Sequence, residues 1–145
     1  MAVIAVAGES AGGGLTTALT LLARDRGEVN IAFPMPIYPM IDDRMATESA
    51  RDNDAAVGDT TTLISAWEHL GDRHGTDRVP PYAAPARATD LRGLPPTFTH
   101  VGDLEPFRDE RSLGFERLRS WVCRSNSRSI PDAGTASIGW SPPPR

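Results

Sequence analysis

The sequence Gly8-Glu9-Ser10-Ala11-Gly12 separates an apolar run from a segment with helical periodicity. Residues 2–7 are almost wholly apolar, which is typical of a strand buried on both faces of a parallel sheet. After the motif, apolar residues recur at the spacing of one helix face, at Leu15, Ala18, Leu19 and Leu22. This order of strand, tight turn and helix predicts an α/β fold.

A Gly-x-Ser-x-Gly motif between a strand and a helix is the arrangement of a nucleophile elbow, here with Glu9 as its second residue. Small residues at Gly8 and Gly12 let the strand and the helix approach closely, and the sharp turn holds the serine in a strained conformation. We therefore predict that Ser10 is a nucleophile. The amide of Ala11, at the helix N-terminus, is predicted to point at the developing oxyanion.

The glycines allow two other interpretations, a turn without chemistry and a phosphate-binding loop. The phosphate loop of nucleoside triphosphatases requires Gly-Lys-Ser/Thr, and no lysine follows these glycines. The strand before the motif and the helix after it favour the elbow.

The rest of the chain alternates between strand and helix patterns. Further strands are expected at 31–38 and 97–101, and further helices at 61–70 and 109–120. Pro34 and Pro36 interrupt the first of these strands. Long loops are expected at 39–60 and 71–96. The alternation predicts a sheet of about three parallel strands with flanking helices.

The character of the sequence changes near its C-terminus. Residues 122–145 contain five serines, end in Ser-Pro-Pro-Pro-Arg, and show no clean periodicity. We therefore predict a partial α/β domain over residues 1–120. Residues 121–145 are predicted to be an aberrant or disordered tail without a stable element.

Composition narrows the possible partners. The 15 basic and 19 acidic residues give a net charge of -4 without a basic stripe, so we expect no nucleic-acid partner. Cys123 is the only cysteine, which excludes an intrachain disulfide and a cysteine-based metal cluster. No signal peptide or membrane span is recognisable. These features predict a soluble cytoplasmic protein without a metal or cofactor.

Four stretches resemble the bacterial hormone-sensitive-lipase family of esterases, in the family's order. Residues 8–15 look like its GDSAGG or GESAGG elbow, and the others are MPIYP at 35–39, YAAP at 82–85 and LPPT at 94–97. The likeness runs from about Ile4 to about Arg119. It implies the α/β-hydrolase fold, with this chain as the C-terminal part of the catalytic domain, and hydrolysis of small carboxylic esters without a cofactor.

The resemblance also implies a catalytic acid. The family carries it in a D-P-L/F-R-D-E motif, which matches residues 105–110, EPFRDE, so Glu105 takes the place of the usual aspartate. A carboxylate there would orient the catalytic imidazole and stabilise its protonated form. Asp103, two residues earlier, is the alternative acid. Both carboxylates could instead belong to a turn or cap a helix.

Two parts of the family's site are missing from the sequence. The HGGG oxyanion loop lies upstream of the elbow in the family, together with earlier strands and the cap. The catalytic histidine belongs to an HGF-like motif downstream of Glu110, but the last histidine here is His100. We expect His69, His74 and His100 to be structural or solvated, because their order in the chain and their predicted positions disfavour a base.

A frameshift would explain the missing histidine and final strand. Reading residues 122–140 one nucleotide earlier permits GVPVEFPVYPGCWHGFDW, in which residues 131–137 become PGCWHGF. Our hypothesis is a frameshift near Ser120 or Trp121, in the gene or in its sequencing. The coding DNA tests it, since the neighbouring frame must give this peptide.

Two functions from different classes follow. The first is a serine carboxylic-ester hydrolase that acts through an acyl-enzyme on Ser10. The alternative is a catalytically inactive truncated fragment, because a serine without its base is not activated.

Overall fold

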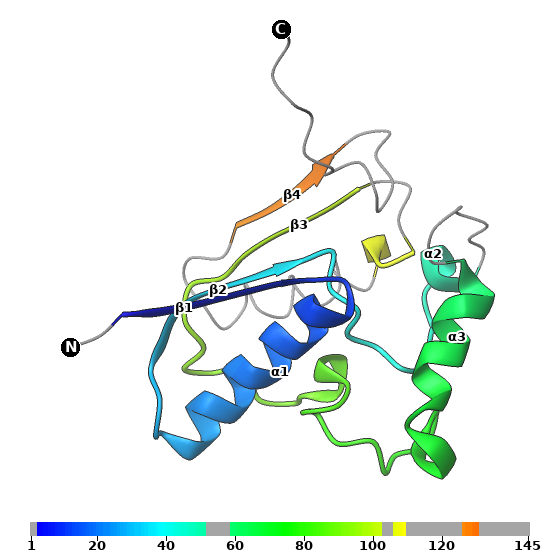
Figure 1. Cartoon of the computed structure of the whole chain (residues 1–145), viewed down its shortest axis with the longest axis horizontal. Coiled ribbons are helices and arrows are strands. Elements are labelled where there is room, and N and C mark those ends of the chain that lie inside the picture. The colour runs from blue at the N-terminus through cyan, green and yellow to red at the C-terminus, as the bar shows by residue number, and fades with distance from the viewer. Residues whose placement is uncertain (1–2, 52–58, 103–105, 110–125, 131–145) are drawn as a thin grey trace, which may run out of the picture.

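The computed structural model describes residues 3–51, 59–102, 106–109 and 126–130 (Figure 1). Its helices and strands are, in order, β1 (Ile4–Glu9), α1 (Ala11–Arg26), β2 (Ile31–Ile37), α2 (Glu48–Arg51), α3 (Thr60–Glu68), β3 (Phe98–Gly102) and β4 (Asn126–Ile130). Two 3-10 turns, η1 (Gly71–Arg73) and η2 (Pro85–Arg87), lie between α3 and β3. The predicted alternation of strands and helices is confirmed in this described part, whereas the helix predicted at 109–120 lies outside it except for Asp109.

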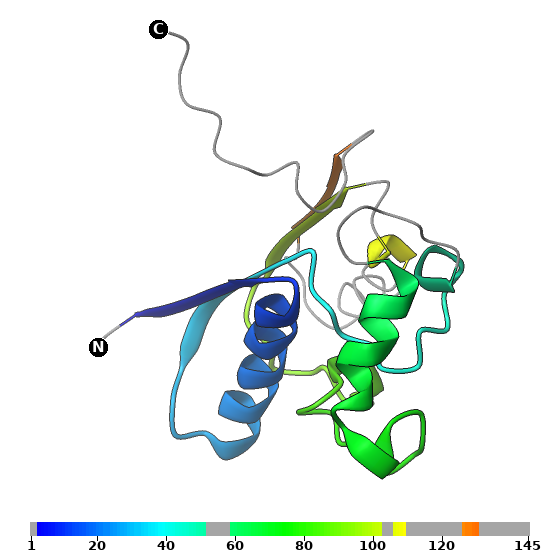
Figure 2. The ribbon, with the colours of Figure 1, turned by 45° about the vertical axis from the view of Figure 1, so that its right-hand side comes forward.

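The strands pair in parallel, β1 with β2 and β3 with β4. β2 also lies beside β3, so the four strands run side by side in Figure 1. α1 packs against β1 and β2, and Figure 2 shows it on one face of these strands. α2 and α3 lie on the side toward which β1 and β2 point. The chain therefore has the predicted parallel α/β architecture.

The burial of β1 and α1 differs from the prediction. The apolar run predicted a strand buried on both faces, but every residue of β1 is exposed or half-buried. Among the described elements, β1 pairs only with β2 and packs mainly against α1, so too few elements cover it to bury both faces. On α1, Leu15 and Leu19 are exposed, and the buried face contains Gly13, Gly14 and Leu21 instead.

The two prolines of β2 interrupt its pairing on one side only. The carbonyl of Ile37 faces β1 and accepts from Ser10 N, whereas the Tyr38 N–H faces β3 and donates to the His100 carbonyl at 2.8 Å. Backbone groups alternate along a strand, so Pro34 and Pro36 share the β3 side with Tyr38. A proline has no N–H to donate to a neighbouring strand. The prolines therefore leave the pairing with β1 continuous from Phe33 to Ile37, after a register shift between Ile4 and Ala5, which explains why the interrupted segment still forms a strand.

The ends of α1 and α3 carry residues that commonly cap helices. α1 ends at Gly27, which has φ 66° and donates its N–H to the Ala23 carbonyl at 2.9 Å. Glycine suits this left-handed C-terminal position. At the start of α3, the Asp59 carboxylate accepts from Thr62 N at 2.7 Å, the contact expected of an N-cap. None of the described helices has the length and apolarity that a membrane span requires.

The two long loops contribute to the main core rather than lying over it. Trp67 and Leu63 of α3 pack with Val101 and Phe107 around the strand end. The loop residues buried with them are Met40, Met45, Val79 and Ala84. The loops thus hold α3 against the carboxyl ends of the strands.

Two elements differ from prediction. The loop predicted over 39–60 contains the short helix α2. The prediction that 121–145 holds no element is wrong at Asn126–Ile130, which form β4 beside β3. An unpaired strand edge offers a row of backbone donors and acceptors, and pairing with it needs no side-chain pattern. The other residues of 121–145 lie outside the described part, so the boundary at residue 120 stays a prediction.

Candidate active site

Ser10 occupies the turn between β1 and α1 in an unusual backbone conformation. Its φ is 52° and its ψ is -117°, a conformation that costs a residue other than glycine about 1–3 kcal/mol. The residue stands at the N-cap position of α1, yet its side chain makes no capping hydrogen bond. A serine at this position commonly caps the helix. The hydroxyl is thus left for another role.

Three backbone hydrogen bonds hold this turn in place. Ser10 N donates to the Ile37 carbonyl at 3.0 Å, at the end of β2. The Ser10 carbonyl accepts from Gly14 N and from Met40 N, both at 3.0 Å. The strained residue is therefore fixed by α1 on one side and by the segment after β2 on the other.

The glycines around Ser10 differ in how tightly they are packed. A Cβ on Gly8 would lie 2.3 Å from the Gly12 carbonyl oxygen, so the predicted close approach is present there. A Cβ on Gly12 would meet nothing within 4 Å, so sterics do not require that glycine. A Cβ on Gly14 would lie 2.1 Å from the Met40 carbonyl oxygen. Gly14 was missed because no local pattern shows what faces it.

Replacing Gly14 with alanine is expected to lower the free energy of unfolding by about 2–3 kcal/mol, because the helix must move away from the Met40 carbonyl. Gly12→Ala is the matched control in the same turn. It should raise the free energy of unfolding by about 0.5–1 kcal/mol, since alanine loses less conformational freedom than glycine. Urea denaturation of both variants measures the difference, and equal stabilities would contradict the packing described.

The predicted oxyanion donor lies at the start of α1. Ala11 is the first residue of the helix and is exposed. The first amides of a helix have no partner within it and carry the positive end of its dipole. The first turn of α1 contains no acidic residue that would neutralise this end. These features suit binding of an anion beside Ser10.

The three histidines serve other contacts. His69 Nδ1 lies 3.0 Å from the Ser65 carbonyl oxygen, and His74 Nε2 lies 3.0 Å from that of Asp43. His100 lies in β3, with its ring edge-on to Tyr38 at 6.3 Å between centroids. Among the hydrogen bonds between described residues, none joins a histidine ring to the Ser10 hydroxyl. The general base is therefore not identified among them.

Both candidate acids, Asp103 and Glu105, lie outside the described residues. The segment that follows them is fixed to α2. Ser49 Oγ donates to the Pro106 carbonyl at 2.9 Å, and the Asp109 carboxylate accepts from Ser49 N at 3.0 Å. Asp109 N in turn donates to Ser49 Oγ at 3.2 Å. The chain is thus anchored directly after the position of Glu105.

Asp109→Asn is expected to destabilise the protein by about 1–2 kcal/mol at neutral pH, because the carboxylate caps α2 through Ser49. The hydrogen bond from Arg108 lowers the pKa of Asp109, partial burial raises it, and the net direction is down. Because the pKa of Asp109 is lower in the folded protein than in the unfolded chain, its ionised carboxylate stabilises the fold. This stabilisation is complete above the ordinary carboxyl pKa of about 4 and is lost as the pH falls through the lowered pKa of the folded protein.

Chemical denaturation at pH 7 and at pH 3 checks this prediction. The difference between the wild type and Asp109→Asn should shrink on acidification. Asp77→Asn, a change at an exposed aspartate, should stay within about 0.5 kcal/mol of the wild type at both pH values. A pH-independent difference for Asp109→Asn would show that its charge is not involved.

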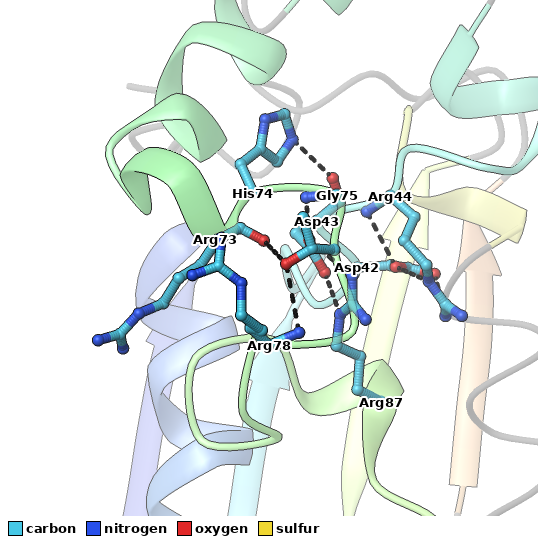
Figure 3. Close-up of polar contacts among 9 residues, drawn as sticks. Asp42, Asp43, Arg44, Arg73, His74, Gly75, Arg78 and Arg87 are labelled. Atoms are coloured by element: carbon cyan, nitrogen blue, oxygen red, sulfur yellow. Dashed lines mark hydrogen bonds and ion pairs between the residues drawn. The ribbon is translucent and has the colours of Figure 1, made fainter.

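A buried ion pair between Asp43 and Arg87 joins the two long loops (Figure 3). The Asp43 carboxylate accepts from Arg87 Nε at 2.6 Å and Nη2 at 2.9 Å, and from Gly75 N at 3.1 Å. The side chains are 0% and 10% exposed, respectively, for Asp43 and Arg87. Burial raises the pKa of the Asp43 carboxyl, but the hydrogen bonds from Arg87 and Gly75 outweigh it and lower the pKa. Asp43 follows Met40 by three residues, so the pair steadies the segment that binds the Ser10 carbonyl.

A family model described as the alpha/beta hydrolase fold matches residues 1–134. Carboxylesterase NlhH of Mycobacterium tuberculosis strain H37Rv is 36% identical over 119 residues, which cover 79% of this chain and 37% of that protein. An acetyl-hydrolase of Streptomyces hygroscopicus is 33% identical over 109 residues, which cover 74% and 36%, respectively. The chain thus spans little more than a third of the length of these relatives.

The structure of this chain is also similar to solved structures of esterases. A bacterial heroin esterase superimposes with a TM-score of 0.89 at 37% identity, over 92% of this chain and 44% of that one. An esterase from Pyrobaculum calidifontis gives a TM-score of 0.77 at 30% identity, over 91% and 44%. The similarity therefore extends from the sequence to the arrangement of the strands and helices.

Proposed function

Because the chain belongs to the hormone-sensitive-lipase-like family of α/β hydrolases, we propose that it carries the nucleophile of a serine carboxylic-ester hydrolase. The nucleophile is Ser10, and the substrates are small carboxylic esters. The observation that carries this proposal is the conformation of Ser10. Ser10 adopts a strained backbone conformation at the N-cap of α1, but its side chain does not cap the helix. Backbone strain of this kind is concentrated at functional sites.

The reaction proceeds through an acyl-enzyme. Ser10 Oγ attacks the ester carbonyl carbon while a general base takes its proton, and the carbonyl oxygen becomes an oxyanion. Collapse of this intermediate breaks the bond to the alcohol, which leaves with the proton from the base. Water then attacks the acyl group on Ser10 with the same base, which releases the carboxylic acid and restores the hydroxyl.

The neighbouring groups have distinct roles in this scheme. The Ala11 amide donates to the oxyanion, and removing a donor of this kind from an enzyme costs about 10²–10³ in rate. Glu105 orients the base, with Asp103 as the alternative acid. The base itself is a histidine in the family that the sequence resembles.

A second candidate function is an inactive fragment. It is favoured by one observation, that no described histidine is hydrogen-bonded to the Ser10 hydroxyl. In that case the fold is retained without turnover, because a serine hydroxyl without a base is a weak nucleophile.

Burst and steady-state hydrolysis of p-nitrophenyl acetate and p-nitrophenyl butyrate separate the two proposals. The esterase proposal predicts release of p-nitrophenolate that Ser10→Ala abolishes. Circular dichroism establishes that both samples are folded. Absence of Ser10-dependent release from a folded wild type would reject the esterase and leave the inactive fragment.

A further inference from the structure

Tyr38 combines a strained backbone with contacts in three directions. Its φ is 32°, which is unusual for a residue other than glycine, and its side chain is buried. Its phenol donates to Glu9 Oε2 at 2.8 Å, and its N–H donates to the His100 carbonyl. Its ring also lies edge-on to that of His100. A single residue therefore joins the end of β1, the end of β2 and β3.

These contacts surround the bonds that hold Ser10. Glu9 directly precedes the serine, and Ile37 and Met40, whose backbone groups bind Ser10 N and its carbonyl, flank Tyr38 in the chain. A shift of Tyr38 would therefore move both anchors of the turn. The hydrogen bond from the Tyr38 phenol to Glu9 links β1, which leads into Ser10, to the segment after β2, which binds the Ser10 backbone.

We propose that Tyr38 is a positioning residue for Ser10, and that its hydrogen bond to Glu9 keeps the turn in its reactive conformation. This inference rests on the proposed role of Ser10 as nucleophile. A phenol donating to a carboxylate is a charge-assisted hydrogen bond, stronger than one between neutral groups. Ser10 and Tyr38 both have a positive φ. Such strained residues persist only where the surrounding structure over-determines them, and the bond from Tyr38 to Glu9 supplies such a constraint.

Loss of the phenol should misalign the serine without unfolding the chain. Tyr38→Phe keeps the ring and its packing against His100 but removes the donor to Glu9. A misplacement of about 1 Å in a reacting group can cost about 10²-fold in rate. We expect a loss of about 10-fold or more in the rate at which a fluorophosphonate probe labels Ser10.

Tyr82→Phe is the matched control. The Tyr82 phenol also donates to a carboxylate, that of Asp25 at 2.7 Å. Tyr82 is exposed, and this hydrogen bond does not involve the residues that hold Ser10. Tyr82→Phe should label at the wild-type rate. Glu9→Gln, which keeps an oxygen to accept from Tyr38, should label faster than Glu9→Ala. The double variant Tyr38→Phe/Glu9→Ala should be no slower than its slower single variant, since both remove one interaction.

Amide hydrogen exchange of the same full-length proteins gives a readout that does not depend on activity. Tyr38→Phe should accelerate exchange of the Ser10 and Met40 amides by about 10-fold and leave the Gly27 amide unchanged. Unchanged exchange at Ser10 and Met40 overturns the positioning role. If the wild type is not labelled by the probe, Ser10 is rejected as the nucleophile. The exchange rates of the Ser10 and Met40 amides then test, without any labelling, whether Tyr38 holds the turn.

Discussion

Replacing Asp43 with alanine is expected to lower the free energy of unfolding by about 3–5 kcal/mol. The substitution leaves the Arg87 guanidinium, only 10% exposed, without the carboxylate that accepts two of its hydrogen bonds. An uncompensated buried charge is among the most destabilising changes in a protein. The Gly75 amide loses its acceptor as well, so both long loops should loosen together.

The partner substitution separates the charge from the packing. Asp43→Ala/Arg87→Met should be less destabilised than Asp43→Ala, because it removes the unpaired charge and fills part of its volume. Asp72→Ala is the control, since it breaks the ion pair with Arg78 whose side chains are 82% and 60% exposed, respectively. Such exposed pairs contribute about 0–1 kcal/mol. Urea denaturation at pH 7 gives all three values, and equal losses for Asp43→Ala and Asp72→Ala would contradict the burial of the pair.

The Asp43 contribution should also depend on pH in a defined direction. The pKa of this carboxyl is lower in the folded protein than in the unfolded chain. Its stabilisation is therefore complete above the ordinary pKa of about 4 and is lost as the pH falls through the lowered folded value. The stability difference between the wild type and Asp43→Ala should shrink in acid.

Under the esterase proposal, replacing Ser10 with alanine is expected to reduce ester turnover by about 10⁴–10⁶-fold, since removal of a serine nucleophile eliminates the acyl-enzyme route. The fold should change little, because the hydroxyl makes no capping hydrogen bond with α1. Steady-state rates with p-nitrophenyl acetate measure the effect.

Ser65→Ala is the control for this experiment. Ser65 lies on the exposed side of α3, and the contact it makes to His69 uses its backbone carbonyl. Ser65→Ala should retain the wild-type rate. A Ser10→Ala protein that hydrolyses the ester at the wild-type rate would assign the activity to another group or to a contaminant.

The order of the elements in the first 26 residues could be predicted because its signals are local, but the burial of β1 and of Leu15 and Leu19 could not, because burial depends on distant elements. An apolar run, a Gly-x-Ser-x-Gly turn and leucines at helical spacing each act within a few residues, and they give β1, the strained Ser10 and α1. Pro34 and Pro36 interrupt the apolar run of the second strand. β2 forms nonetheless because both prolines fall on the side away from β1.

Elements that depend on distant partners could not be predicted in this way. α2 is only four residues long and is capped by Asp109, 60 positions from Ser49. β4 has no periodicity of its own and pairs with β3 through the backbone. A local pattern carries no information on either contact.

The same limit applies to the candidate site. Ser10 has the geometry that its motif predicted, but its support from Tyr38 and from Asp43 comes from contacts across the fold. The motif points to Gly12, although a Cβ there would contact nothing within 4 Å. It does not point to Gly14, where a Cβ would clash with the Met40 carbonyl oxygen. The predicted acids at 103 and 105, and the shifted histidine motif at 131–137, lie outside the described residues.

Peptide mass spectrometry of the chain after brief incubation with p-nitrophenyl acetate tests the central claim most directly. We expect one acetyl group on the peptide that contains Ser10, and none on that peptide in Ser10→Ala. Acetylation confined to other residues of a folded wild type, or its complete absence, would contradict the assignment of Ser10 as the nucleophile.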